Sequence, residues 1–269
     1  MVRKAGNRGS FYPYGCDELR SLLKNFNSEL DNRNMRKDTL KRKPRAIIVP
    51  HSGFIYSGFT ANIAHKLIRN SKPKRVIVIG PSHHLDFNGI SLAINDYYET
   101  PCGNILIDKK YSRLLKEKFD TLTISRVHYL EYSTETQMPF IRLYEPNSKI
   151  VEIVYNLPDS EYKTLSKMIS FLLRDESNVV VVSSDLSSFY SIEEAKIIDN
   201  ICLAGVLKKS SSLLDKGCEA CGVVGIKALL DVAREEEFGV ELLDYSSSAD
   251  VNGDKKRVVG YMSAVLFKE

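Results

Sequence analysis

The run Val76–Ile79 constrains the fold of this chain more than any other stretch. Four β-branched apolar residues in a row, closed by a Gly-Pro pair, are typical of a strand that is buried on both faces of a parallel or mixed sheet. A serine, His83 and His84 follow directly. Because open α/β sheets bind ligands at the carboxyl ends of their strands, the run predicts two imidazoles at a position where chemistry is usual.

A second short apolar run, Ala46–Val49, ends in the same way, with Pro50 and His51. The stretch Gly58–Ile68 between the two runs has the apolar spacing of a helix. Together they predict one βαβ unit with a right-handed crossover. If the two strands are parallel, His51 and His83 leave the same edge of the sheet. Two imidazoles that converge from adjacent strand ends form a metal-ligand or acid–base arrangement, whereas a single one would more often only hydrogen-bond a loop carbonyl.

Strands and helices alternate along the rest of the chain. Further strands are predicted at Ile90–Ile94, Lys149–Val154, Asn178–Ser184, Glu241–Tyr245 and Val258–Phe267. Further helices are predicted at Asp17–Leu30, Tyr111–Lys118, Ser160–Leu173, Ile192–Leu207 and Gly222–Val232. The fold class is therefore α/β, with a mixed, mostly buried sheet and helices on both faces. No low-complexity linker divides the chain, so residues 1–269 are interpreted as a single domain.

Three acidic residues are candidates for the site. Asp185 follows the strand Asn178–Ser184, where its carboxylate would orient an imidazole or a water, or would cap the next helix. Glu131 and Glu135 are four residues apart, on one face of a predicted helix, and either is a possible ligand or base. The alternative is that they are solvent-facing charges at the amino end of that helix, which explains one of them more easily than both.

Other conspicuous features are interpreted as structural. His84 faces solvent, His65 lies within a helix, and His128 lies in a polar stretch. The segment Arg3–Tyr14, rich in glycine and aromatic residues, is predicted to be irregular and to lie across the surface. The basic cluster Arg33–Arg45 carries no aromatic residues, so it predicts a solvated loop and not a nucleic-acid interface.

Composition narrows the compartment and the partners. The net charge is only +4, and no apolar run approaches the length of a membrane span, so neither a nucleic-acid nor a membrane partner is expected. Five cysteines without a signal peptide indicate a reducing, cytoplasmic location. Cys218 and Cys221 form a C-x-x-C pair, which is a weak redox or metal signal because no second pair accompanies it. Two ordinary thiols are favoured, and a structural disulfide stays open for a hyperthermophilic source.

Several stretches together resemble the Memo family. They follow the family's order over nearly the whole chain: RKAGNRGSFYP, AIIVPHSGFIYSG, VIVIGPSHH, EYSTETQMPF, VVVVSSDLS, the Cys-Gly pair at 221–222 and LLDYSSSADVNGD. The specific part is P-H-x-G followed by G-P-S-H-H. The resemblance implies a fold like that of class III extradiol dioxygenases (LigB-like), which hold non-haem iron with histidines and a carboxylate. It also implies copper or iron binding with redox activity, or an adaptor role, as described for some eukaryotic members.

The resemblance also assigns residues by position. It makes His51 and His83 the two central metal histidines. The family's third ligand in eukaryotes is a cysteine, and the matching position here is Val251, with Asp250 beside it as a possible oxygen ligand. Two further family histidines are replaced by Tyr132 and Ser188.

These observations lead to one principal hypothesis and two alternatives. The principal one is a metal-dependent oxidoreductase that uses Fe(II) or copper, with metal ligands His51, His83 and Asp250 and pocket residues Asp185, Tyr132 and Glu135. Loss of two imidazoles removes proton-transfer partners. The first alternative is therefore a non-catalytic protein whose cleft binds a small-molecule or peptide ligand. The second is thiol redox chemistry at Cys218 and Cys221.

Overall fold

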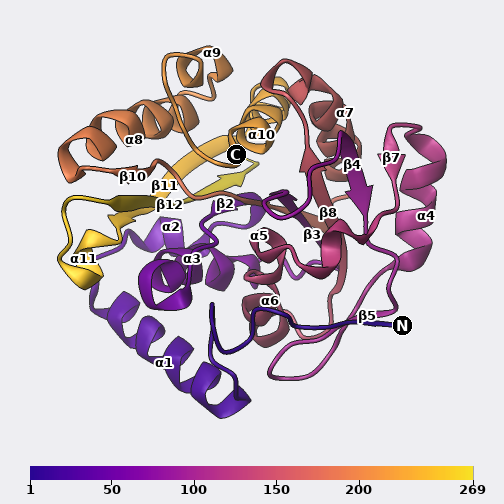
Figure 1. The fold of residues 1–269 in the computed structure, drawn as a ribbon, viewed down its shortest axis with the longest axis horizontal. Coiled ribbons are helices and arrows are strands. Elements are labelled where there is room, and N and C mark those ends of the chain that lie inside the picture. Colours follow the sequence, from indigo (N-terminus) through magenta and orange to yellow (C-terminus); the bar gives the residue numbers. More distant parts are fainter. Residues whose placement is uncertain (269) are drawn as a thin grey trace.

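The structure, a computed structural model, describes residues 1–268, and β-strands form its centre. The strands are β1 (Val2–Arg3), β2 (Pro44–Val49), β3 (Arg75–Pro81), β4 (Gly89–Leu92), β5 (Tyr97–Tyr98), β6 (Ile105–Leu106), β7 (Leu122–Thr123), β8 (Lys149–Asn156), β9 (Asn178–Ser183), β10 (Ser188–Tyr190), β11 (Gly239–Ser247) and β12 (Val258–Phe267). The main sheet has the order β10-β12-β2-β9-β3-β8-β4-β7, and β11 pairs with β12 (Figure 1). Strands β2, β9, β3 and β8 are parallel, and antiparallel β12 and β4 flank them, so the sheet is mixed as predicted.

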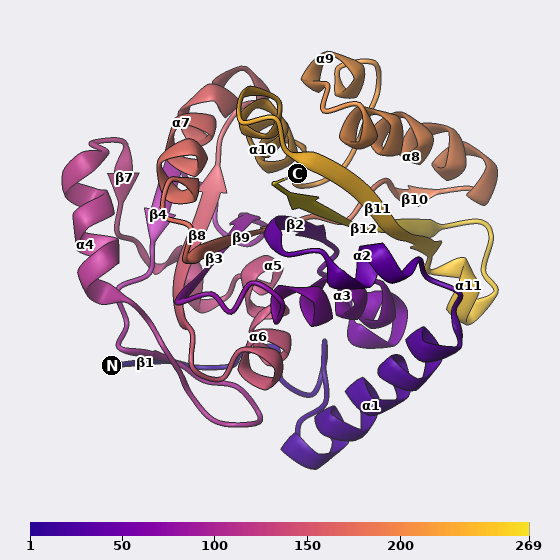
Figure 2. The ribbon, with the colours of Figure 1, turned by 180° about the vertical axis from the view of Figure 1, so that it is seen from behind.

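Helices cover both faces of this sheet (Figure 2). They are α1 (Cys16–Asn32), α2 (Lys37–Lys41), α3 (Phe54–Ile68), α4 (Lys109–Lys118), α5 (Tyr132–Glu135), α6 (Met138–Tyr144), α7 (Tyr162–Leu173), α8 (Ile192–Leu207), α9 (Ser211–Leu214), α10 (Val223–Glu235) and α11 (Ala249–Asn252). Two short 3-10 turns lie at Arg126–Tyr129 and Asp159–Glu161. No helix among residues 1–268 combines the length and the apolar character needed to cross a bilayer.

Alternation along the central strands supplies two cores from one sheet. Ala46 and Ile48 of β2 pack toward helices α7, α8 and α10, whereas Ile47 and Val49 pack toward α1, α3 and α6. All four side chains are fully buried. Because each buried Val or Ile side chain stabilises the fold by about 1.5–3 kcal/mol, runs that are apolar on both faces belong at the centre of the sheet. The predicted α/β class with helices on both faces is confirmed.

The predicted βαβ unit needs one correction. Strands β2 and β3 are parallel, as expected, but they are not adjacent, because β9 lies between them and pairs with both. The run Val179–Val182 is as apolar as the other two and is completely buried, so it suits a central position at least as well. The order of these three apolar strands in the sheet is set by the later part of the chain, which local patterns do not specify.

The segment Arg3–Tyr14 is irregular and lies mostly near the surface, as predicted, but Arg3 and Tyr12 anchor it in the interior. Arg3 is fully buried, and β1 pairs with β5 in a small sheet of order β1-β5-β6. The basic cluster 33–45 is likewise only in part a solvated loop. It contains α2, Arg42 forms an ion pair with Glu241 at 2.8 Å, and the buried Arg45 donates to the carbonyl of Leu173 at 2.6 Å. These arginines tie the surface segment to strand β11 and to the carboxyl end of helix α7.

Four of the five cysteines form disulfides. Cys16 pairs with Cys102, and Cys202 pairs with Cys218, while Cys221 is a free thiol. The expectation of two ordinary thiols in the C-x-x-C pair therefore holds for Cys221 and is wrong for Cys218. The reason is that α8 and α9 fold back on each other, which brings Cys202 of α8 to the segment that follows α9.

Candidate metal centre

The candidate site lies at the carboxyl ends of three parallel strands. His51 follows β2, His83 follows β3, and Asp185 follows β9, the strand between them. The two imidazole rings meet edge to face, with their centroids 5.1 Å apart and their planes at 79°. The two histidines therefore meet as predicted, although they come from strands that are one strand apart.

The third member of the cluster is Cys221, which comes from the C-terminal part of the sequence. It lies just before α10, and its Sγ is 3.3 Å from Nε2 of His51. Each of His51, His83 and Cys221 offers one donor atom, and these three atoms lie within 4.8 Å of one another. The C-x-x-C pair that contains Cys221 is only a weak redox or metal signal in the sequence, which did not predict Cys221 as a partner of the two histidines. The available signal was the Cys-Gly pair at the start of a helix, and nothing local connects that pair to a histidine 170 residues away.

A pocket of about 510 Å³ opens onto the cluster. Its size is within the range of small-ligand sites. The pocket is lined by Phe11, His51, Ser52, Gly53, Tyr56, His83, Tyr132, Asp185, Ser188, Phe189, Cys221, Ser248, Val259 and Tyr261. This lining contains five phenylalanine and tyrosine side chains and one carboxylate but no lysine or arginine. A ligand recognised here would gain mainly from ring stacking and hydrogen bonds to hydroxyl groups.

Tyr132 and Asp185 lie in the pocket wall. The Tyr132 ring stacks on His83, with centroids 4.6 Å apart, and on Phe11 at 4.8 Å. Burial raises the pKa of its phenol well above the ordinary value, so it stays protonated at neutral pH. One oxygen of the Asp185 carboxylate accepts from the backbone N–H of His51 at 2.8 Å and from that of Ser52. Asp185 therefore holds the loop after β2 through its backbone and through the Ser52 hydroxyl.

Two predicted site residues lie elsewhere. Glu135 is fully buried outside the pocket, where it accepts from Arg3, from Tyr12 at 2.6 Å and from the backbone N–H of Asn7 at 2.7 Å. Asp250 does not line the pocket, because its carboxylate accepts from the backbone N–H of Ser247 at 2.7 Å and so closes the turn before α11. The structure therefore does not bring Glu135 or Asp250 to the histidines.

Glu131 is not a solvent-facing charge but contacts the cluster directly. It is fully buried, and its carboxylate accepts from Nδ1 of His83 at 2.9 Å, from the backbone N–H of His83 at 2.6 Å and from that of Ser133 at 2.9 Å. Burial alone would raise the pKa of Glu131, but these hydrogen bonds outweigh it and lower the pKa to about 2. Glu131 is therefore ionised at neutral pH.

Burial lowers the pKa of His51. The Cys221 side chain is exposed toward the pocket, but the protein atoms packed around its sulfur, and then repulsion from the Asp185 carboxylate, raise the pKa of the thiol. Without a metal, the cluster therefore holds a neutral His51 imidazole and a protonated thiol. Since thiolate and neutral imidazole are the forms that bind metals, metal binding would release the thiol proton.

The remaining histidines have separate surroundings. His84 touches the edge of the Tyr132 ring and is exposed. His128 forms a buried pair with Glu152 at 3.3 Å. His65 is buried, stacks on Phe140 with centroids 4.8 Å apart, and hydrogen-bonds Gln137 at 2.8 Å.

His65 is expected to make stability depend on pH. Burial lowers its pKa to about 4 from 6.5, so the unfolded chain binds the proton first. The stability it contributes is complete above about pH 6.5 and is lost as the pH falls toward 4, with a slope of up to about 1.4 kcal/mol per pH unit. Urea unfolding between about pH 7 and 5 measures this slope. His65→Phe keeps the stacking and should flatten it, whereas His84→Phe should leave it unchanged; an equal slope in all three proteins would contradict the expectation.

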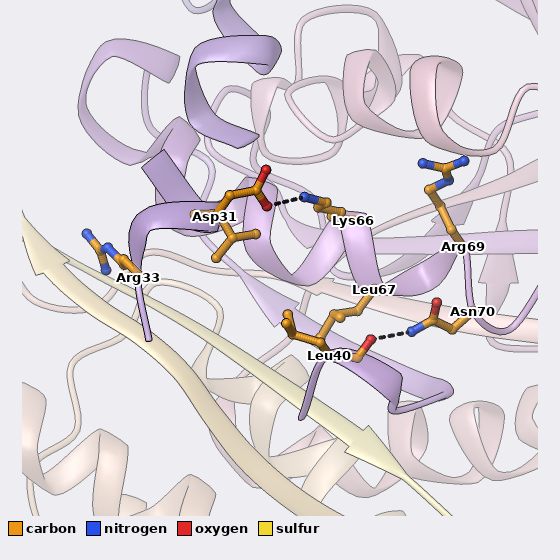
Figure 3. A pocket seen from close by; sticks show the side chains of 8 residues that line it. Asp31, Arg33, Leu40, Lys66, Leu67, Arg69 and Asn70 are labelled. Carbon is orange, nitrogen blue, oxygen red and sulfur yellow. Dashed lines mark hydrogen bonds and ion pairs between the residues drawn. The ribbon is translucent and has the colours of Figure 1, made fainter. Parts of the chain in front are cut away.

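A second pocket, of about 500 Å³, lies among α1, α2 and α3 (Figure 3). It is lined by Leu30, Asp31, Arg33, Leu40, Lys66, Leu67, Arg69 and Asn70. Lys66 is already paired with Asp31 at 3.4 Å, and Arg33 is paired with Asp244 at 2.6 Å. The guanidinium groups of Arg33 and Arg69 lie on opposite sides of the Asp31–Lys66 pair and do not converge on it (Figure 3). The pocket beside the cysteine and histidines is therefore the stronger candidate for a functional site.

The whole chain is similar to proteins of one family. The family model described as "Memo-like protein" matches residues 3–265. A MEMO1 family protein of Aquifex aeolicus is 31% identical over 276 residues, which cover 98% of this chain and 99% of the relative. The MEMO1 family protein TV1383 of Thermoplasma volcanium is 30% identical over the full length of both chains. The crystal structure of the uncharacterized protein JW3007 from Escherichia coli K12 shares the fold, with a TM-score of 0.54 at 12% identity, over 83% of this chain and all of that one.

Proposed function

The chain belongs to the Memo family, and from this premise we propose that it binds one copper or iron ion and uses it in an oxidation–reduction reaction. The observation that carries the proposal is the cluster of His51, His83 and Cys221, whose donor atoms lie within 4.8 Å of one another at a pocket. We assign these three residues as the ligands. Asp250, which the sequence suggested as the third ligand, gives way to Cys221.

The donor set fits a transition metal. Imidazole binds copper, iron and zinc, and thiolate favours the softer ions among them. Nδ1 of each histidine is in a hydrogen bond with a non-ligand residue, that of His51 with Ser183 at 3.0 Å and that of His83 with Glu131 at 2.9 Å. This leaves Nε2 of each ring for a ligand bond, and Nε2 of His51 contacts only the third proposed ligand, Cys221. Replacing a carboxylate by a thiolate shifts the preference toward copper. When bound, such an ion would supply one-electron chemistry.

The protein's own residues would provide the binding site for the reactant. Phe11, Tyr132 and Tyr261 form apolar walls, and Ser188 and Ser248 offer hydroxyl groups. We therefore propose a small molecule or a peptide side chain as the ligand. The interpretation of residues 1–269 as one domain fits this picture, since the cluster draws on both halves of the chain. The cytoplasmic location and the absence of nucleic-acid partners stay predictions from the sequence.

Metal titration of the purified protein tests the proposal. Wild-type protein should bind about one equivalent of Cu(I), Fe(II) or Zn(II), as measured by calorimetry under anaerobic conditions. His83→Ala and Cys221→Ser should each weaken binding at least about 100-fold, because a three-ligand site loses one of its protein donors. His84→Ala is the matched control, since it removes the neighbouring imidazole outside the cluster. No saturable binding in the wild type, or equal losses in His83→Ala and His84→Ala, would refute the assignment.

The second candidate is a binding protein without turnover. It is favoured by Tyr132 and Ser188, which occupy positions where the family resemblance expects imidazoles and so remove two proton-transfer groups from the pocket. The two candidates separate in a melting-temperature screen of metals against small aromatic ligands and peptides. Stabilisation by an organic ligand but by no metal favours the second candidate, whereas stabilisation by a metal favours the first.

A further inference from the structure

We propose that two buried hydrogen-bond networks, one ending at Ser183 and one at Glu131, hold both imidazoles as the tautomer with a free Nε2 lone pair. Ser183 and Glu131 are then positioning residues for the cluster. This inference rests on the proposed metal site, because it concerns how His51 and His83 are prepared to become ligands. The proton on each imidazole ring can be assigned because the hydrogen bonds around it end at groups that can only accept.

At His83, the hydrogen bond to Glu131 determines which ring nitrogen carries the proton. Oε1 of Glu131 already accepts from the backbone N–H of Ser133 at 2.9 Å, and the same oxygen lies 2.9 Å from Nδ1 of His83, so the ring is the donor in this contact. The second carboxylate oxygen accepts from the backbone N–H of His83 at 2.6 Å, and both residues are thereby locked together. The Glu131 side chain is fully buried, so water does not reach its carboxylate, whereas the His83 side chain is 23% exposed. The Nδ1 nitrogen carries the proton, and Nε2 does not.

At His51, the hydroxyl of Ser183 determines which ring nitrogen carries the proton. The hydroxyl of Ser183 lies 2.6 Å from the carbonyl of Ser133, which can only accept, so its single proton is donated there. Toward Nδ1 of His51, at 3.0 Å, the same oxygen can then only accept. His51 therefore also carries its proton on Nδ1. Its free Nε2 faces the Cys221 thiol at 3.3 Å and can accept the S–H.

Gln137 supports this arrangement from behind. Its Nε2 is 2.9 Å from the carbonyl of Pro50, another group that can only accept, which fixes the orientation of the amide. The same Nε2 donates to Ser183 at 2.9 Å, and the amide oxygen is 2.8 Å from Nε2 of His65. A continuous buried chain thus leads from His65 through Gln137 and Ser183 to His51. His65, structural by its surroundings, contributes to holding the ligand tautomer.

The consequence is a cluster that needs little rearrangement to bind an ion. Outer hydrogen bonds to the non-ligating nitrogen fix the tautomer and the ring orientation of metal-binding histidines, and their loss typically weakens metal affinity about 10–100-fold. Here both outer partners are buried, and they belong to different elements, Ser183 to β9 and Glu131 to the amino end of α5. The two rings therefore have different partners, and the two networks meet at Ser133, whose carbonyl accepts from Ser183 and whose backbone N–H donates to Glu131.

Imidazole nitrogen NMR on metal-free protein tests the tautomers directly. The chain has only five histidines, so selective ¹⁵N-histidine labelling gives few signals, and His51→Ala and His83→Ala assign them. At about two pH units above the ordinary histidine pKa, His51 and His83 should both show a protonated Nδ1 and an unprotonated Nε2. A protonated Nε2 on either ring would overturn the inference, whatever the protein does with metals.

Variants then test the consequence for binding. Glu131→Gln and Ser183→Ala should each weaken metal binding about 10–100-fold and let the affected ring populate the other tautomer. Ser187→Ala is the matched control, because Ser187 is equally buried and its hydroxyl has no partner among residues 1–268. It should leave the affinity and both tautomers unchanged. Glu131→Gln keeps the size of the side chain and covers the case in which Ser183→Ala does not fold.

The outcomes separate this inference from the proposed function. If the wild type binds no metal but its tautomers are as assigned and shift in the variants, the metal site fails and the positioning role of Ser183 and Glu131 is supported. If the wild type binds metal and both variants bind it equally well, the metal site stands and the positioning role is refuted. A loss of affinity in Ser187→Ala as large as in Ser183→Ala would also refute it.

Discussion

Glu135→Gln is expected to lower the free energy of unfolding by about 3–5 kcal/mol, the cost of leaving a buried charge without its counter-ion. Glu135 forms an ion pair with Arg3, and neither side chain is accessible to solvent. Arg3 further donates to the carbonyls of His128 at 2.8 Å and of Glu131 at 3.0 Å. Removing the Glu135 carboxylate leaves the guanidinium in the interior without its ion-pair partner, so that the buried Glu152 is the remaining carboxylate that acts on it.

A set of variants isolates the pair. Arg3→Met should cost a similar amount, and the double variant Arg3→Met/Glu135→Gln should cost clearly less than the sum of the two single losses. Glu176→Gln, which breaks the exposed pair with Lys268, is the matched control and should cause no measurable change. Urea unfolding at neutral pH measures the free energy of unfolding of the wild type and of the four variants. A loss below about 1 kcal/mol in Glu135→Gln would contradict the expectation.

Loss of this pair should also disturb the pocket. Glu135 holds the backbone N–H groups of Gly6 and Asn7, and Phe11 stacks on Tyr132 a few residues later. The N-terminal segment is thus fixed at one buried point and provides a wall of the pocket. Glu135 was predicted to be a pocket residue; it instead helps to position the pocket wall, because it holds the segment that carries Phe11.

Removal of the Cys16–Cys102 disulfide is expected to cost about 4–5 kcal/mol. The bond joins residues 86 positions apart, so it removes a large part of the conformational freedom of the unfolded chain. The double variant Cys16→Ser/Cys102→Ser, unfolded in urea without reductant, measures the cost. Both serines keep the volume of the site close to the original, and the packing of α1 is retained.

The second disulfide is an internal control for this explanation. Cys202 and Cys218 are 16 positions apart, and loss of their bond should cost about 3 kcal/mol, because a shorter loop restricts the unfolded chain less. Thiol counting by mass spectrometry first verifies that each protein contains the expected bonds. Equal costs for the two bonds, or a larger cost for the short loop, would contradict the entropic explanation.

The fold was predictable because its signals are local. The runs Ala46–Val49, Val76–Ile79 and Asn178–Ser183 are apolar on both faces, and a residue pattern of this kind has few alternatives to a central strand between two helical layers. Their order in the sheet was not predictable, because parallel strands are joined through long crossovers and the sequence of a strand does not specify which strand it pairs with. Arg3 was misjudged for the same reason, since its buried partner Glu135 is 132 residues away.

The candidate site was predictable only in part. His51 and His83 follow directly from the strand ends, so a local pattern sufficed to pair them. Cys221 joins them through the packing of α10 against the sheet, a contact that no spacing in the sequence records. The assignment of Asp250 relied on its neighbourhood to a family position, and its carboxylate instead closes a local turn with Ser247.

The place of β9 between β2 and β3 has a consequence for how the protein is made. A chain emerging from the ribosome exposes His51 and His83 early, but the strand that spaces them, Asn178–Ser183, follows only after about two thirds of the chain has been synthesised. Cys221 comes later still. The two imidazoles therefore cannot take up their final separation before Asn178–Ser183 has been synthesised, and the cluster of three donors cannot form before Cys221 has followed.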